Sequence, residues 1–244
     1  MTLPVFLVEA LPVGGSAVLD GPEGRHAATV RRLREGEELV LSDGSGAQVR
    51  CVVDEVAKDS LRLTVVERWV VPEPTPRVVL AQALVKGDRG ELAVELATEA
   101  GVDAVLPWKA ARCVTKWEDG PRGAKALARW RSTAREAAKQ ARRARVPSVG
   151  EPVTTAALAK LVGTSATTLV LHESATSPLS AVDLPARGDV LLVVGPEGGI
   201  TDQELATLTE AGARVVRLGP TVLRASTAAA VALGALGVLT DRWA

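Results

Sequence analysis

Two patterns of apolar and polar residues divide the chain. In residues 1–72, short apolar stretches alternate with polar turns, and the turn Ser-Asp-Gly-Ser-Gly at 42–46 separates two of them. An Asp-Gly pair between apolar runs is typical of a β-hairpin. One short helix is expected around residues 26–34. Strands of this length and spacing predict a small β-barrel.

The segment between Val71 and Arg77 marks a boundary, because it contains three prolines in alternating positions. Such a segment favours extended backbone and excludes a helix. We therefore expect two domains, at residues 1–72 and 73–244.

The second domain alternates between apolar runs and amphipathic segments, which predicts a mostly parallel sheet with helices on both faces, an α/β fold. The predicted strands are 77–84, 103–108, 167–173, 189–195 and 214–219, and the predicted helices are 89–101, 124–145, 201–212 and 226–243.

Composition says more about the cellular location of the protein than about its function. The chain has 29 basic and 29 acidic residues, so its net charge indicates no partner. Cys51 and Cys113 match no metal-ligand spacing. The first residues lack a basic segment, and the longest uncharged stretch, 225–240, is shorter than the ~20 residues of a membrane span. We expect a cytoplasmic protein with no membrane segment.

The turn Gly-Pro-Glu-Gly-Gly at 195–199 follows a predicted strand and precedes a helix. Thr201 and Glu204 have the spacing of a capping box, which marks the helix start. Glycines leave backbone N–H and C=O groups accessible at a strand end where ligands commonly bind. Taken alone, the turn is equally compatible with a tight connection. It matches neither the dinucleotide nor the phosphate-loop fingerprint.

A second glycine-proline turn raises the probability of a site. It lies in Leu218–Ala228, again after a strand, and is followed by Ser226 and Thr227, which are suited to cap the last helix. A third strand ends at Leu171–Glu173. Three strand ends therefore place apolar, glycine and charged residues at one edge of the sheet.

Together these turns resemble the SPOUT class of RNA methyltransferases, and more closely the bacterial family that methylates N3 of a uridine in 16S ribosomal RNA. The segments 82–114 and 129–149 and the spacing of His26, Arg32 and Gly36 are similar to the same family. The resemblance implies a PUA-like amino-terminal barrel and a deep trefoil knot at about residues 168–235. The sequence departs from the family at Ser226, where an acidic residue is usual.

The resemblance also implies S-adenosylmethionine as methyl donor, bound by main-chain groups of these turns. Because the methyl group of a sulfonium is already activated, no metal is expected. The residues expected to bind the donor are Leu171, Glu173, Gly195, Glu197, Gly198, Gly199, Leu218, Gly219, Leu223 and Thr227.

Two residues are candidates for the chemistry. Uridine N3 carries a proton at neutral pH, so the site has to remove it or stabilise the anion. We expect Arg224 to stabilise the charge on the uracil and Glu197 to act as general base or to orient Arg224. The alternatives are a capping arginine and a turn carboxylate that accepts backbone N–H groups.

Basic residues are concentrated in two places despite the neutral total. Arg131, Arg135, Lys139, Arg142 and Arg145 would share one face of a helix over 124–145. Such a stripe suits phosphates, and the alternative is a solvated charged surface. In the first domain the candidate RNA-binding residues are Arg25, His26 and Arg32.

Three functions remain to be compared. The first is a methyltransferase acting as a homodimer on 16S rRNA or the small ribosomal subunit. The second is a non-catalytic RNA-binding ribosome-assembly factor with the same fold. A nucleotide-dependent oxidoreductase is disfavoured, because its glycine fingerprint is missing.

Overall fold

The computed structural model describes residues 3–243, so the expected domain limits at 1 and 244 lie outside the described residues. The chain forms two compact units, residues 1–73 with 138–146 and residues 74–137 with 147–244. This division differs from the expected domains, in which 138–146 belongs to the second. The segment belongs with the first unit because Gly46 N donates to Ala144 O at 3.0 Å and Val146 N donates to Gly44 O at 2.8 Å.

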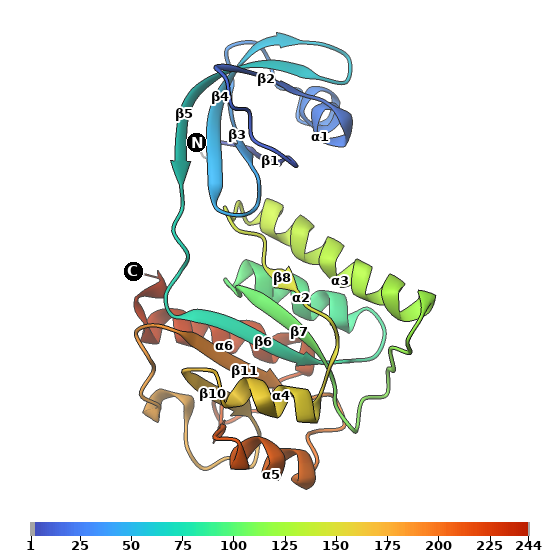
Figure 1. Ribbon diagram of the computed structural model, residues 1–244, viewed down its shortest axis with the longest axis vertical. Helices are drawn as coiled ribbons and strands as arrows, with labels where there is room; N and C mark the ends of the chain where they lie inside the picture. The colour runs from blue at the N-terminus through green and yellow to red at the C-terminus, as the bar shows by residue number, and fades with distance from the viewer. Residues whose placement is uncertain (1–2, 244) are drawn as a thin grey trace. The chain divides into compact units, whose positions relative to one another are not determined.

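The first unit is a five-stranded sheet with strand order β1-β3-β4-β5-β2 (Figure 1). β1 pairs parallel with β3, and the other neighbours are antiparallel. In residues 3–243, β1 and β2 do not pair with each other, so strand pairing does not close the expected barrel. Its strands are β1 (Val5–Leu7), β2 (Ser16–Leu19), β3 (Glu38–Ser42), β4 (Ala47–Val56) and β5 (Leu61–Val70).

The core of the first unit is formed by alternating strand residues, among them Leu39, Leu41, Leu61 and Leu63. The helix expected around 26–34 lies earlier in the chain. Helix α1 (Gly21–Arg25) continues directly into one π-helical turn, His26–Val30.

The second unit contains a parallel sheet with strand order β12-β10-β11-β6-β7-β8. The pairings between these strands are all parallel, which confirms the expected sheet. Its central strands are apolar on both faces because both faces are covered. The strands are β6 (Arg77–Ala83), β7 (Ala104–Lys109), β8 (Ser148–Val149), β9 (Val153–Thr154), β10 (Thr167–Leu171), β11 (Asp189–Val194) and β12 (Arg214–Val216).

Two pairs of helices cover this sheet. Helix α2 packs against α6 and α4 packs against α5, on opposite faces (Figure 1). Helix α4 is not among the predicted helices, and Thr154 caps it by accepting from Ala157 N at 3.3 Å. None of the helices in the described chain is long and apolar enough to cross a membrane. The helices are α2 (Arg89–Glu99), α3 (Pro121–Gln140), α4 (Thr155–Val162), α5 (Asp202–Glu210) and α6 (Ala225–Leu239).

Helix α3 ends at Gln140, and the expected end at Arg145 is wrong. Arg142 has a left-handed backbone with φ of 55°. Its N–H donates to Lys139 O, and Arg143 N donates to Ala138 O, which is the hydrogen-bond pattern of a Schellman cap. The five cations from Arg131 to Arg145 therefore do not form one continuous helical face.

Candidate functional site

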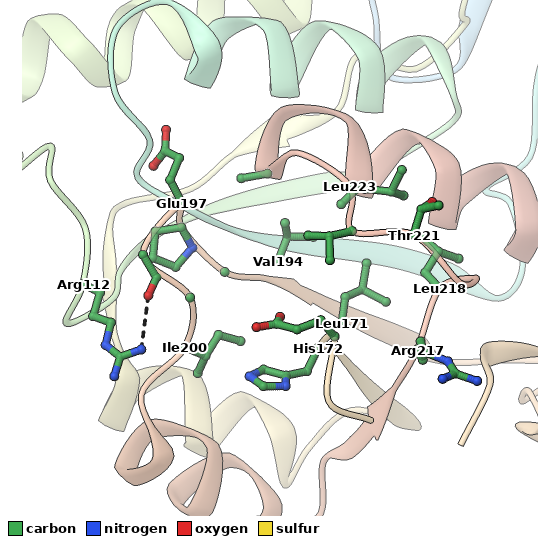
Figure 2. A pocket seen from close by; sticks show the side chains of 18 of the residues that line it. Arg112, Leu171, His172, Val194, Glu197, Ile200, Arg217, Leu218, Thr221 and Leu223 are labelled. Carbon is green, nitrogen blue, oxygen red and sulfur yellow. Dashed lines mark hydrogen bonds between the residues drawn. The ribbon is translucent and has the colours of Figure 1, made fainter. Parts of the chain in front are cut away.

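A pocket of about 440 Å³ opens at the carboxyl ends of β10 and β11 and beside the segment that follows β12 (Figure 2). The carboxyl edge of a parallel sheet is the usual ligand position in such folds. Of the residues expected to bind the donor, those that line this pocket are Leu171, Glu173, Gly195, Glu197, Gly198, Gly199, Leu218 and Leu223.

The structure places three of the expected site residues elsewhere. Gly219, Arg224 and Thr227 are not among the described residues that line the pocket. Arg224 is the N-cap residue of α6, where its carbonyl accepts from Thr227 Oγ1 at 3.2 Å and from Ala228 N at 3.0 Å. Within one chain, the contacts of Arg224 are therefore those of a capping residue.

Several residues that line the pocket were not predicted from the sequence, above all the two arginines Arg112 and Arg217. Figure 2 shows these arginines on opposite sides of the pocket, with Leu171, Val194 and Ile200 between them. Arg112 follows β7, whose carboxyl end lies at the same sheet edge. Because ligands bind at the carboxyl ends of parallel strands, this position could have been predicted from the sequence. The other missed residues are His172, Val194, Pro196, Ile200, Asp202, Thr221, Val222, Ala225 and Ala228.

Close approach explains the glycines of the first turn. A Cβ on Gly195 would lie 2.7 Å from Ile200 Cγ1, and a Cβ on Gly198 would lie 3.0 Å from Arg112 Cβ. Gly199 has φ of 75°, which only glycine adopts without strain. The backbone of this turn therefore forms the pocket wall at a position that side chains cannot occupy.

The second turn is built differently. Gly219 has φ of 80°, but a Cβ there would meet no atom within 4 Å. Val222 further along the same turn is 80% exposed. Glycine is required here by backbone conformation alone, and the turn is open to solvent.

Glu197 is tied to a neighbouring loop, since its Oε1 accepts from Lys86 N at 3.1 Å. This bond corresponds to the alternative of a turn carboxylate that accepts a backbone N–H. Glu197 also lines the pocket, so both of its possible roles place it at the same wall.

Glu204 holds together the segments around the first turn. Its Oε1 accepts from Ala111 N at 2.8 Å and from Thr155 Oγ1 at 2.9 Å. Its Oε2 accepts from Thr201 N at 3.1 Å and Thr201 Oγ1 at 2.9 Å, which completes the capping box of α5. Glu204 is 6% exposed. Burial raises the pKa of Glu204, but these hydrogen bonds outweigh burial and hold the pKa below its ordinary value.

Arg112 lies next to the segment that Glu204 holds. One of its guanidinium nitrogens donates to Gly198 O at 3.2 Å, shown as the dashed line in Figure 2. Because Ala111 is bonded to Glu204, the backbone that carries Arg112 is fixed against the first turn.

In the second unit, both candidate RNA-binding residues are exposed. Arg131 contacts Glu151 Oε1 at 2.9 Å and donates to Val149 O at 3.1 Å. Arg135 lies one turn further along α3 and is also exposed.

In the first unit, Lys139 is the least accessible candidate. It pairs with Glu23 at 2.6 Å, is 17% exposed and lies 5.8 Å from the centre of the Phe6 ring. The Lys139 ammonium is therefore already neutralised and largely shielded from a phosphate.

The other candidates of the first unit lie nearer the solvent. Arg25 pairs with Asp59 at 3.4 Å, and His26 is half-buried. Arg32 and Arg142 are exposed on left-handed backbone.

Two family models match the chain, and both describe RNA methyltransferases. Residues 72–237 match an RNA methyltransferase domain, and residues 19–66 match an RNA methyltransferase PUA domain. The first match covers the parallel sheet and the whole pocket. The second match covers most of the first unit.

Relatives and solved structures narrow the class. The ribosomal RNA small subunit methyltransferase E of Mycobacterium bovis is 56% identical over 100% of this chain and 94% of its own length. The protein of that name from Bacillus subtilis is 33% identical over 91% of this chain and 90% of its own length. The Neisseria gonorrhoeae protein of that name, solved bound to S-adenosyl methionine, has a TM-score of 0.84 at 27% identity and 98% coverage of both chains. The chain therefore belongs to the ribosomal RNA small subunit methyltransferase E family.

Proposed function

We propose that this protein transfers the methyl group of S-adenosylmethionine to N3 of a uridine in the 16S rRNA of the small ribosomal subunit. Membership in the family makes the chain an S-adenosylmethionine-dependent rRNA methyltransferase. The uridine and its N3 atom are the finer part of the proposal. The observation that carries the proposal is the pocket walled by the bare backbone of the first turn.

The residues present fit the methyl donor. The volume of about 440 Å³ is in the range of small-molecule sites, and Gly195 and Gly198 leave backbone exposed where a Cβ would collide. Leu171, Leu218 and Leu223 offer apolar contact for the adenine. Once bound, the donor supplies an activated methyl group.

Carboxylates in the pocket wall suit a cationic donor. Glu173 and Asp202 line the pocket together with Glu197, and a sulfonium is favoured near negative charge. We therefore keep two proposed roles for Glu197. It orients the pocket wall through its hydrogen bond with Lys86 N, or it accepts a proton. Gly219 and Thr227 support the donor site indirectly, through the shape of the second turn and the start of α6.

The proposed enzyme is a homodimer with a trefoil knot at about residues 168–235. Val231 and Val238 on α6 are 48% and 76% exposed, and Leu239 is exposed beside Val238. Spacings of seven and eight residues put them on one side of the helix, where a second copy could cover them. The exposed Arg224 at the start of α6 would then reach a partner's pocket and act there on the uracil.

The RNA partner is supported by exposed cations in each unit. Arg131 and Arg135 in the second unit and Arg25, Arg32 and Arg142 in the first have exposed side chains that a phosphate can approach, with His26 beside Arg25. Lys139 is the weakest of the original candidates, because its side chain is only 17% exposed and pairs with Glu23. A cytoplasmic location follows from the ribosomal substrate.

Two measurements test the proposal. Calorimetric titration with S-adenosylmethionine should show saturable binding, and 16S rRNA treated with protein and donor should carry a methyl group on N3 of one uridine by mass mapping. A non-catalytic assembly factor would bind RNA but leave the RNA unmethylated. Methylation at another atom or base would contradict the uridine N3 assignment and leave the methyltransferase assignment intact.

A further inference from the structure

We propose that the guanidinium of Arg112 contacts the acceptor uracil and stabilises its negative charge when N3 loses its proton. The inference rests on the proposed function and adds a residue that touches the substrate. The same role was expected of Arg224, which does not line the pocket of its own chain.

Arg112 lies where the acceptor has to arrive. It is exposed at the pocket wall formed by the first turn, whereas Leu218, Thr221 and Leu223 lie on the other side (Figure 2). The leucines of that side suit the adenine, and Arg217 on the same side is exposed. The side of Arg112 therefore remains for the transferred methyl group and the base that receives it.

The charge of Arg112 is not neutralised by an ion pair in the described part of the chain. Its hydrogen bond goes to a backbone carbonyl, Gly198 O, and in residues 3–243 no carboxylate forms an ion pair with it. Arg131, by contrast, pairs with Glu151 at 2.9 Å. A guanidinium has five N–H donors, so the bond to Gly198 leaves others for the uracil carbonyl oxygens.

Arg112 is also held in place before any substrate binds. Glu204 accepts from Ala111 N at 2.8 Å, and Gly198 lies against the backbone and Cβ of Arg112. A donor that is already fixed stabilises developing charge without the cost of reorganisation. Glu204 is a positioning residue in this arrangement.

The reaction balances without a further reagent. The N3–H bond breaks and its proton passes to solvent water. The resulting charge spreads over N3 and the two carbonyl oxygens, where Arg112 stabilises it. The N3 electron pair then forms a bond to the methyl carbon, and the carbon–sulfur bond breaks with its electrons on sulfur, which becomes a neutral thioether.

The test compares Arg112→Ala and Arg112→Lys with Arg214→Ala, a matched control at an exposed arginine outside the pocket. For Arg112→Ala we expect kcat at neutral pH to fall on the order of 10²-fold, the usual cost of removing one such donor. The dissociation constant of S-adenosylmethionine from calorimetry should change far less than kcat. Arg112→Lys should retain part of the activity, and Arg214→Ala should retain all of it.

The pH dependence separates a catalytic role from a structural one. If Arg112 stabilises the anion, its loss raises the pKa of bound N3, so the rising limb of the pH–kcat profile shifts to higher pH in Arg112→Ala. An unchanged limb, or weaker donor binding with unchanged kcat, would overturn the inference. Mapping the wild-type product is independent of both outcomes, so a methyl group away from uridine N3 would refute the proposed function separately.

Discussion

The two glycine-proline turns at the pocket have similar sequences and different structures. The first, Gly195–Gly199, is surrounded by Ile200 and Arg112, and Glu204 fastens the segments beside it. In the second, a Cβ on Gly219 would meet no atom within 4 Å, and Val222 is exposed. The same motif thus has two structural roles. In the first turn it allows dense packing in the pocket wall, and in the second it allows a left-handed backbone in an open loop. The first should be rigid before the donor binds, and the second should order on binding.

The largest effect is expected from Glu204→Ala, which removes the fastening of the first turn. The substitution leaves Ala111 N, Thr155 Oγ1 and the Thr201 donors without their acceptor in a partly buried place. A fully buried donor without a partner costs about 1–3 kcal/mol, so for these partly buried donors together we expect a loss of about 3 kcal/mol in the free energy of unfolding. Urea denaturation measures it. A loss no larger than that of a surface substitution would show that the first turn does not depend on Glu204.

Gly195→Ala tests the packing of the first turn directly. The new Cβ would lie 2.7 Å from Ile200 Cγ1, so either Ile200 or the turn has to move. Overpacking costs about 1–3 kcal/mol, and donor binding should weaken with it. Gly163→Ala is the matched control, because its Cβ would lie 3.6 Å from the nearest atom on ordinary helical backbone. If both variants lose the same stability and donor affinity, the close packing of the first turn contributes nothing to either.

Gly219→Ala should have a smaller energetic cost than Gly195→Ala. The new Cβ introduces backbone strain but no steric clash. A left-handed alanine costs about 1–2 kcal/mol. Asparagine tolerates this conformation better, so Gly219→Asn should recover part of the loss in donor affinity measured by calorimetry. Equal losses in both variants would mean that the second turn also requires the absence of a side chain.

The smallest effect that we expect is a dependence of the stability on pH. Since the folded-state pKa of Glu204 lies below its ordinary value of 4.5, its carboxylate stabilises the fold fully above that value. This contribution is lost as the pH falls through the folded-state pKa. The stability difference between wild type and Glu204→Gln should therefore shrink in acid, as measured by urea midpoints from neutral to acidic pH. A constant difference would mean that the charge of Glu204 contributes nothing.

The sheet could be predicted because its strands are nearly continuous apolar runs bounded by glycine and proline. The helix α4 was missed because it has only eight residues and follows two-residue strands. The end of α3 was misplaced because arginine favours helix, whereas Arg142 adopts a left-handed conformation that no composition rule anticipates.

The site was predictable where residues are adjacent in sequence to the recognised turns. Arg112 and Glu204 were missed as site components because their importance comes from contacts across the fold. Ala111 and Glu204 are 93 positions apart, and only the folded sheet brings them together. The pocket wall is therefore a tertiary property even where its glycines can be read from the sequence.

Strand β11 joins the two halves of the parallel sheet, because it lies between β10 and β6. Its first residue, Asp189, pairs with Arg77, which is 112 positions earlier. During synthesis, β7 can pair with one edge of β6 early, but the other edge stays unpaired until β11 is made. A fragment that stops before Asp189 should aggregate through the unpaired apolar edges of β6 and β10. Co-expression of the missing carboxyl-terminal piece should restore solubility, so this enzyme is suited to split-protein complementation at the 182–188 connection.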